Sequence, residues 1–138
     1  MSGSPPRVIV IEDHPLVRAG QRMLLEIVGY EVAEITSGAD LEWFTPISGV
    51  SQAIVADFDL GPGMTGVEVA LAIMRRTGER IPTLVLSASL GARSVAEAQA
   101  HEMTVMFKPA QEEKVLAWVA EALGRQRPGS VASRETRV

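Results

Sequence analysis

The stretch Val8-Ile9-Val10-Ile11-Glu12-Asp13 is a run of four branched apolar residues that ends in two adjacent acids. Short, continuously apolar runs of this kind are typical of parallel strands that are buried on both faces. Three later runs follow the same design, and each ends in a different polar residue: 53–56 before Asp57, 83–86 before Ser87 and 105–107 before Lys108. We therefore predict four buried strands whose carboxyl ends carry polar side chains.

Helical spacing of apolar residues predicts helices between the strands, over 16–28, 67–77, 92–101 and 115–123, with a short helix over 38–44. Residues 31–36 alternate polar and apolar side chains, as a half-exposed edge strand does. Alternating strands and helices predict an α/β fold, and right-handed crossovers favour a doubly wound parallel sheet of order 2-1-3-4-5 with helices on both faces. Ligands of such sheets bind where the carboxyl ends of strands 1 and 3 meet.

Composition limits the classes of function. The chain has 138 residues, which suits one domain, and no cysteine, which excludes disulfides and thiolate sites. The net charge is −4, and the tail 125–138 carries +3, which leaves −7 on residues 1–124. An acidic body argues against nucleic-acid binding, and no apolar stretch approaches the ~20 residues that span a membrane. We expect a cytoplasmic protein with disordered residues 1–6, one domain over 7–124 and a disordered basic tail over 125–138.

Asp57 is the first candidate for chemistry. A carboxylate at a strand end, followed by the glycine-rich stretch 58–63, can act as a nucleophile toward phosphorus, although such a residue also caps turns. Glu12 and Asp13 would lie beside it, and three close carboxylates repel one another unless a cation binds. Mg²⁺ prefers oxygen ligands and phosphate oxygens, so we expect a Mg²⁺ site here. Alternatively, or in addition, Asp13 caps the helix that follows.

Two further strand ends complete the predicted crevice. The Ser87 hydroxyl can donate a hydrogen bond to a phosphoryl oxygen, although loop serines are common. Lys108, placed before Pro109 and a predicted helix, can balance the acids and then bind a phosphoryl oxygen. The tryptophans and methionines are interpreted as core or packing residues.

Taken together, these motifs resemble the receiver domain of two-component response regulators over residues 7–124. The matching segments are 8–15, 56–66, 84–88 and 107–109. The resemblance implies a flavodoxin-like fold, a family for which a receiver is itself a standard example. It implies that Asp57 accepts a phosphoryl group from a sensor histidine kinase or histidine phosphotransfer protein. It also implies that Asp13, Asp57 and the backbone carbonyl of Asp59 bind Mg²⁺, that Glu12 acts partly through water, and that Ser87 and Lys108 bind the phosphoryl oxygens.

The resemblance also defines the expected role. The protein would signal through contacts with an unknown downstream protein, with only self-phosphorylation and self-dephosphorylation as chemistry and with no DNA-binding output domain. It would be a stand-alone receiver or part of a hybrid kinase, and the last helix–strand–helix face is a candidate homodimer surface. Two departures from the family pattern stand out. Val105 occupies the usual aromatic position, and residues 100–103 replace a small Gly-Ala pair.

Two other functions stay open at this point. Asp57-Phe58-Asp59 resembles the nucleophile motif of haloacid-dehalogenase-type phosphohydrolases, but there the motif follows the first strand and a Thr or Val stands in the place of Gly61. The second is a receiver-like binding module that is never phosphorylated.

Overall fold

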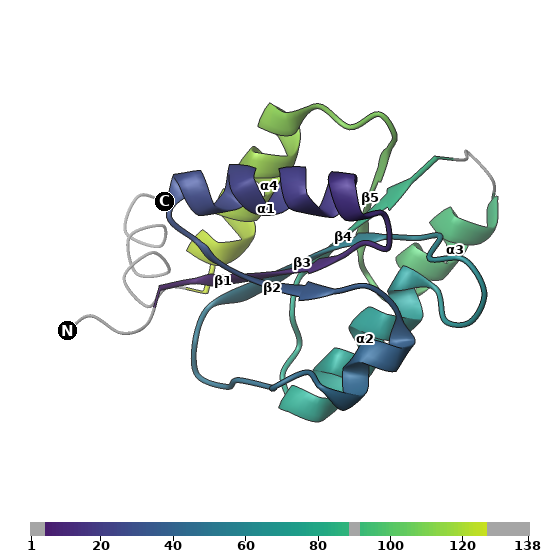
Figure 1. Ribbon diagram of the computed structural model, residues 1–138, viewed down its shortest axis with the longest axis horizontal. Helices are drawn as coiled ribbons and strands as arrows, with labels where there is room; N and C mark the ends of the chain where they lie inside the picture. Colours follow the sequence, from purple (N-terminus) through teal and green to yellow (C-terminus); the bar gives the residue numbers. More distant parts are fainter. Residues whose placement is uncertain (1–4, 89–91, 127–138) are drawn as a thin grey trace, which may run out of the picture.

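A five-stranded parallel sheet forms the centre of the computed structural model, which describes residues 5–88 and 92–126 (Figure 1). The strands are β1 (Arg7–Ile11), β2 (Glu31–Ile35), β3 (Gln52–Asp57), β4 (Thr83–Ser87) and β5 (Thr104–Phe107). The helices are α1 (Pro15–Val28), the 3-10 helix η1 (Gly38–Glu42), α2 (Gly66–Thr77), α3 (Ala92–Ala100) and α4 (Glu112–Gly124).

The strand order is β2-β1-β3-β4-β5, so the predicted doubly wound, flavodoxin-like sheet is confirmed. Every neighbouring pair is parallel, and the register sets Asp57 opposite Leu86 and Ser87 opposite Phe107. The carboxyl ends of β1, β3, β4 and β5 therefore meet at one edge of the sheet. β1, β3 and β4 are buried along their whole length, which agrees with their unbroken apolar runs.

Helices cover both faces of the sheet. α1 and α4 lie on one face, and α2 and α3 lie on the other (Figure 1). Alternate residues of each strand point to opposite faces, which produces two hydrophobic cores. One core joins Ile9, Ile54 and Val85 to α2 and α3, and the other joins Val8, Val10 and Val55 to α1 and α4.

Local sequence explains where α2 lies. Thr65 and Glu68 form a reciprocal capping box at its start, and Gly78 ends it in the left-handed conformation at φ 72°. This cap fixes the loop that runs from Asp57 to the first turn of α2.

The predicted helix over 38–44 is only the 3-10 helix η1, so the described residues contain four α-helices rather than five. Gly38 and the capping side chain of Ser37 favour a short turn, and the apolar residues there are too few to bury a helical face. The interpretation of Trp43 as a core or packing residue is wrong, because its side chain is 81% exposed at the end of η1.

α1 also differs from expectation. Its apolar spacing predicts a buried face, yet Leu25 is its one buried residue. The large apolar side chains Leu16, Val17, Met23, Ile27 and Val28 are exposed. The apolar face of α1 is thus wider than the part that packs on the sheet. The five exposed apolar side chains form a row on α1 that faces outward.

The predicted disordered segments lie mostly outside the described residues, which exclude 1–4 and 127–138. Gln126, which the prediction assigned to the tail, contacts the sheet: its amide accepts from Gln52 N–H at 3.0 Å and donates to the Gln52 carbonyl at 2.9 Å. Within the described ranges, no helix is long and apolar enough to cross a lipid bilayer.

Candidate functional site

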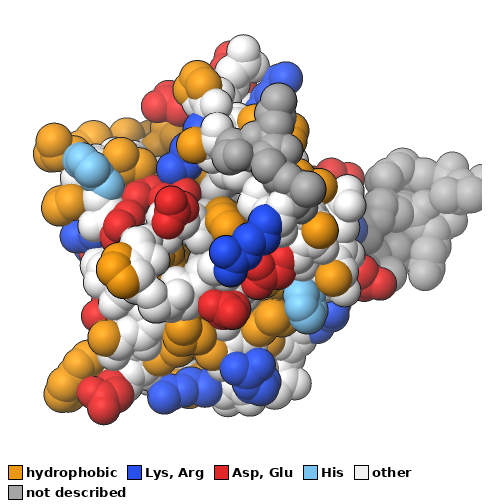
Figure 2. Space-filling view, turned by 90° about the vertical axis from the view of Figure 1, so that its right-hand side faces the viewer, with side chains coloured by type: hydrophobic (Ala, Val, Ile, Leu, Met, Phe, Trp, Pro, Cys, Tyr) orange, Lys and Arg blue, Asp and Glu red, His pale blue; other side chains and the backbone are white. Residues whose placement is uncertain are grey.

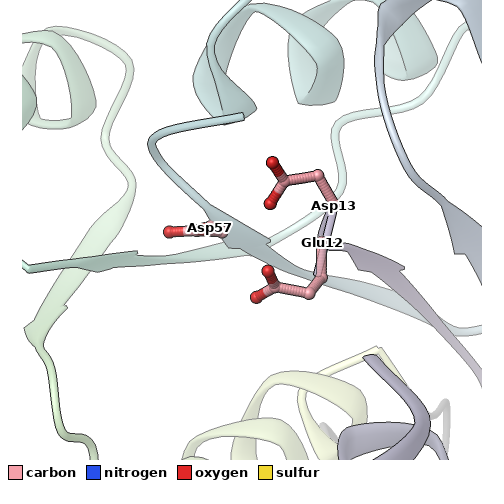
Figure 3. A group of neighbouring side chains, drawn as sticks. All are labelled: Glu12, Asp13 and Asp57. Carbon is pink, nitrogen blue, oxygen red and sulfur yellow. The ribbon is translucent and has the colours of Figure 1, made fainter. Parts of the chain in front are cut away.

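Three carboxylates converge at the carboxyl edge of the sheet. Glu12 and Asp13 follow β1, and Asp57 ends β3. A carboxylate oxygen from each lies within 4.8 Å of the others, and the three side chains point into the same space (Figure 3). Glu12 is 2% exposed and Asp57 is 6% exposed, whereas Asp13 is exposed. Figure 2 views this edge and shows acidic side chains gathered there beside hydrophobic ones.

Burial controls the ionisation of the two inner acids. Desolvation raises the pKa of Asp57, and the Lys108 ammonium and a backbone hydrogen bond at Asp59 oppose the rise without cancelling it. Desolvation also raises the pKa of Glu12, and the negative charges of Asp57 and Asp13 add to that rise. Burial and mutual repulsion therefore disfavour the ionised forms of both carboxylates, and a nearby cation would stabilise those forms.

Glu12 has one satisfied and one unsatisfied oxygen. Its Oε2 accepts a hydrogen bond from the His14 N–H at 3.1 Å. Its Oε1 is buried and has no hydrogen-bond partner among the described residues. The alternative role of Asp13 as the helix cap is not found: His14 is the N-cap residue of α1, and its side chain makes no capping hydrogen bond.

Lys108 brings the positive charge to this crevice. Its Nζ lies 2.9 Å from Asp57 Oδ1, and its backbone N–H donates to the Ser87 carbonyl at 2.8 Å. That backbone bond fixes Lys108 at the end of β4. The following Pro109 does not open a helix as predicted, since α4 begins only at Glu112.

A cavity of about 490 Å³ lies beside Asp57 and Lys108. Asp57, Ser87 and Lys108 line it, together with two residues that the sequence interpretation missed, Arg93 and Ser94. Ser87 is buried, and its Oγ lies 2.9 Å from Ser94 Oγ. Ser94 belongs to the first turn of α3, where the sequence shows only a small polar residue in a weak helical pattern.

The acid of the loop after Asp57, Asp59, does not belong to the group of three close carboxylates. The Asp59 Oδ1 accepts the Gly61 N–H at 3.1 Å, and its side chain is exposed. Gly61 and Gly63 take left-handed conformations at φ 80° and 104°, which explains the glycines in this stretch. Further on, Gly66 N–H donates to the Phe58 carbonyl at 2.9 Å and closes the loop against β3.

Comparison with protein families identifies the chain. The model of the response regulator receiver domain matches residues 8–120. The chain belongs to the receiver domain family. The comparison with curated protein sequences found no match. The family is a signalling family and not one of classical enzymes, as the sequence resemblance implied.

Solved receivers share the fold at low sequence identity. A receiver domain protein of Methanospirillum hungatei is 17% identical with a TM-score of 0.76, and covers 89% of this chain and 97% of its own. A chemotaxis protein of Vibrio cholerae is 23% identical with a TM-score of 0.68, covering 86% and 99%. The receiver domain of a histidine kinase from Syntrophus aciditrophicus is 20% identical with a TM-score of 0.74, covering 88% and 92%.

The two departures from the receiver pattern have structural counterparts. Val105, in the usual aromatic position, is partly buried and packs against the core on the α2 and α3 face. In the segment that replaces the Gly-Ala pair, Glu102 takes a left-handed conformation at φ 60°. Arg80 supports that turn, because its guanidinium donates to the His101 carbonyl at 2.7 Å and to Glu102 at 3.2 Å.

Proposed function

We propose that this receiver accepts one phosphoryl group on Asp57 from a phosphohistidine and signals through protein contacts. The observation that carries the proposal is the ion pair between Lys108 Nζ and Asp57 Oδ1, in a cavity that Ser87 also lines. A buried carboxylate with a cation and a hydroxyl beside it matches the needs of phosphoryl transfer, where the catalytic work is positioning and charge stabilisation.

The carboxylates fit a Mg²⁺ ion. Their oxygens lie within 4.8 Å of one another, and the Glu12 Oε1 is buried without a partner among the described residues. We propose that Asp13, Asp57 and the Asp59 backbone carbonyl hold the ion, with Glu12 acting partly through water. When bound, Mg²⁺ would supply positive charge for the phosphoryl oxygens and for the acids.

In the proposed transfer, an Asp57 carboxylate oxygen forms a bond to phosphorus while the bond from phosphorus to the donor imidazole nitrogen breaks. The Lys108 ammonium then exchanges its partner from the free carboxylate to a phosphoryl oxygen, and the Ser87 hydroxyl donates to another. Attack of water on the same phosphorus returns Asp57 to its free form.

The exposed row on α1 gives the phosphodonor a place to dock. An apolar groove of about 540 Å³ runs between α1 and the start of α4, and Lys108 lines both this groove and the Asp57 cavity. Leu16 and Val17 line the groove from α1, and Pro109 and Val115 line it from the other side. Exposed apolar patches of this kind mark protein contacts. We propose that a helix of a sensor histidine kinase or histidine phosphotransfer protein binds here, with its phosphohistidine beside Asp57.

Phosphorylation would add about −1.5 to −2 charge and new acceptor oxygens to the crevice. We propose that residues 7–124 act as the signalling domain, in the cytoplasm, and that an unidentified downstream protein reads the change. Binding of nucleic acid is not part of the proposal. A homodimer through α3, β5 and α4 stays a prediction, which sedimentation with and without beryllofluoride tests.

Stoichiometry separates this function from its alternatives. The chain is incubated with Mg²⁺ and acetyl phosphate, and in parallel with p-nitrophenyl phosphate. An acceptor gains one phosphoryl group per chain and releases p-nitrophenol no faster than a Asp57→Asn variant does. Sustained multiple turnover that depends on Asp57 would instead support the phosphohydrolase. A binding module would remain unlabelled and would bind its partners equally well with and without beryllofluoride.

A further inference from the structure

Among the described residues that line the cavity, Ser94 is the one buried polar residue to which the proposed function gives no task. Its Oγ lies 2.9 Å from Ser87 Oγ, and each residue is 4% exposed. Ser94 itself lines the Asp57 cavity, from the first turn of α3, whereas Ser87 ends β4. Two hydroxyls from different elements therefore meet at hydrogen-bond distance beside the acceptor.

The proton count of this pair limits what it can do. Each serine hydroxyl carries one proton and two acceptor lone pairs, and either oxygen of the pair can be the donor. Once the Ser87 proton is directed to a phosphoryl oxygen, Ser87 cannot also donate to Ser94. The 2.9 Å contact then persists as a hydrogen bond only with Ser94 as donor and Ser87 as acceptor.

We infer that Ser94 is a positioning residue for phosphoryl binding, which orients the Ser87 hydroxyl by donating to it in a chain from Ser94 through Ser87 to the phosphoryl oxygen. The inference rests on the proposed function of Asp57 and adds to it. Hydrogen bonds in such a chain polarise and strengthen one another in a buried site. Because Ser94 belongs to α3, the chain also links that helix to the state of the crevice.

The size of the effect follows from the bond that is lost. Removing the Ser94 hydroxyl takes away the 2.9 Å hydrogen bond through which Ser94 would orient the Ser87 hydroxyl. A net hydrogen bond between neutral groups is worth about fivefold in an equilibrium constant. Removing both hydroxyls leaves two small apolar side chains. Once Ser87 has been replaced by alanine, replacing Ser94 as well should therefore change the affinity little.

A double-mutant cycle tests this inference. Beryllofluoride affinity is measured in the presence of Mg²⁺ for the wild-type chain, Ser94→Ala, Ser87→Ala and the double variant, by titration of intrinsic tryptophan fluorescence or ¹⁹F resonance intensity. We expect Ser94→Ala to weaken binding about fivefold in the wild-type background and to have no further effect in the Ser87→Ala background. Ser94→Thr, which retains the hydroxyl, should restore affinity, and Gln99→Ala, on the same helix with an exposed side chain, should leave it unchanged.

Three results would overturn the inference. The first is an unchanged affinity in Ser94→Ala. The second is an equal loss in both backgrounds, which would assign the effect to packing of α3. The third is a wild-type chain that binds no beryllofluoride and takes no phosphoryl group from acetyl phosphate, which would remove the proposed function as well. In the first two cases the wild-type chain is still labelled, so failure of the inference is distinct from failure of the proposed function.

Discussion

Lys108 forms its ion pair with Asp57 across the end of an intervening strand. β4 lies between β3 and β5, and Lys108 is held over it by the 2.8 Å bond from its N–H to the Ser87 carbonyl. The side chain then reaches Asp57 Oδ1 at 2.9 Å. One lysine thus connects three strand ends, and a phosphoryl group on Asp57 would lie under its ammonium.

The first prediction concerns this cation. Lys108→Met should slow labelling by acetyl phosphate about 100-fold. The substitution removes a preorganised positive charge that stabilises the negative charge developing on the transferred phosphoryl group. Lys114→Met, on the exposed surface of α4, is the matched control and should label at the wild-type rate. The measurement is the rate of mass increase at saturating Mg²⁺. Equal rates for Lys108→Met and the wild-type chain would exclude Lys108 from phosphoryl binding.

The second prediction concerns Gly66, which begins α2. A Cβ atom at this position would collide with the backbone carbonyl oxygen of Asp57, so the loop and the acceptor strand can approach only at a glycine. Gly66→Ala should lower the free energy of unfolding by about 1–3 kcal/mol, as overpacking does. Urea denaturation measures the loss, and Gly20→Ala, at an open position in α1, should cause none. A Gly66→Ala chain of wild-type stability would contradict this packing.

The third prediction separates docking from chemistry. Leu16 and Ile27 are 78% and 77% exposed on α1. Leu16→Gln with Ile27→Gln should slow phosphotransfer from a histidine donor at least 10-fold, since loss of an apolar anchor of about 1.4 kcal/mol has that effect. Labelling by acetyl phosphate should not change.

A panel of autophosphorylated sensor kinases supplies the donors for this experiment, and the fastest wild-type donor is used for the variants. Trp43→Gln removes an equally exposed apolar side chain outside α1 and serves as the control. Transfer that falls in Trp43→Gln but not in the α1 variant would show that the donor binds elsewhere.

The fourth prediction links pH to stability. Burial raises the pKa of Asp57 above its ordinary 3.8 and that of Glu12 above its ordinary 4.5. The folded state then holds protons more tightly than the unfolded state. The stability that these two carboxyl groups contribute is fully present when the pH is below their ordinary pKa values. It is lost as the pH rises through their raised, folded-state pKa values. In EDTA, the wild-type chain should therefore lose stability relative to Glu12→Gln as the pH rises from about 4 toward neutrality.

Mg²⁺ should reverse this loss. A cation that binds only the folded state at 100 times its dissociation constant adds about 2.7 kcal/mol to the free energy of unfolding. Urea denaturation at several pH values, with Mg²⁺ and with EDTA, measures both effects. A wild-type chain whose stability relative to Glu12→Gln is independent of pH, or that gains nothing from Mg²⁺ at neutral pH, would refute the proposed charge balance.

Strand composition allowed most of the fold to be predicted. Unbroken apolar runs are typical of strands buried on both faces, and the order 2-1-3-4-5 is one that places the polar strand at an edge. The same runs end in polar residues, so the convergence of Glu12, Asp57 and Lys108 followed from parallel topology alone. Their roles in phosphoryl transfer rest on residue type and on family resemblance, and stay predictions.

Other features could not be predicted because they depend on tertiary contacts. The spacing of Leu16 and Ile27 indicates a helix, but does not say how wide a strip the sheet covers, so the exposed row on α1 was missed. Ser94 gave no signal, since a serine in a weak helical pattern has many uses. The interpretation of Trp43 as a core or packing residue rests on residue type alone, and the short η1 leaves its side chain in solvent.

The most direct test of the central claim is the intact mass of the chain after incubation with acetyl phosphate and Mg²⁺. We predict that the wild-type chain and Asp59→Asn, whose side chain lies outside the carboxylate cluster, each gain one phosphoryl group. Asp57→Asn should gain none. Labelling of Asp57→Asn to the wild-type extent would contradict the assignment of Asp57 as the acceptor.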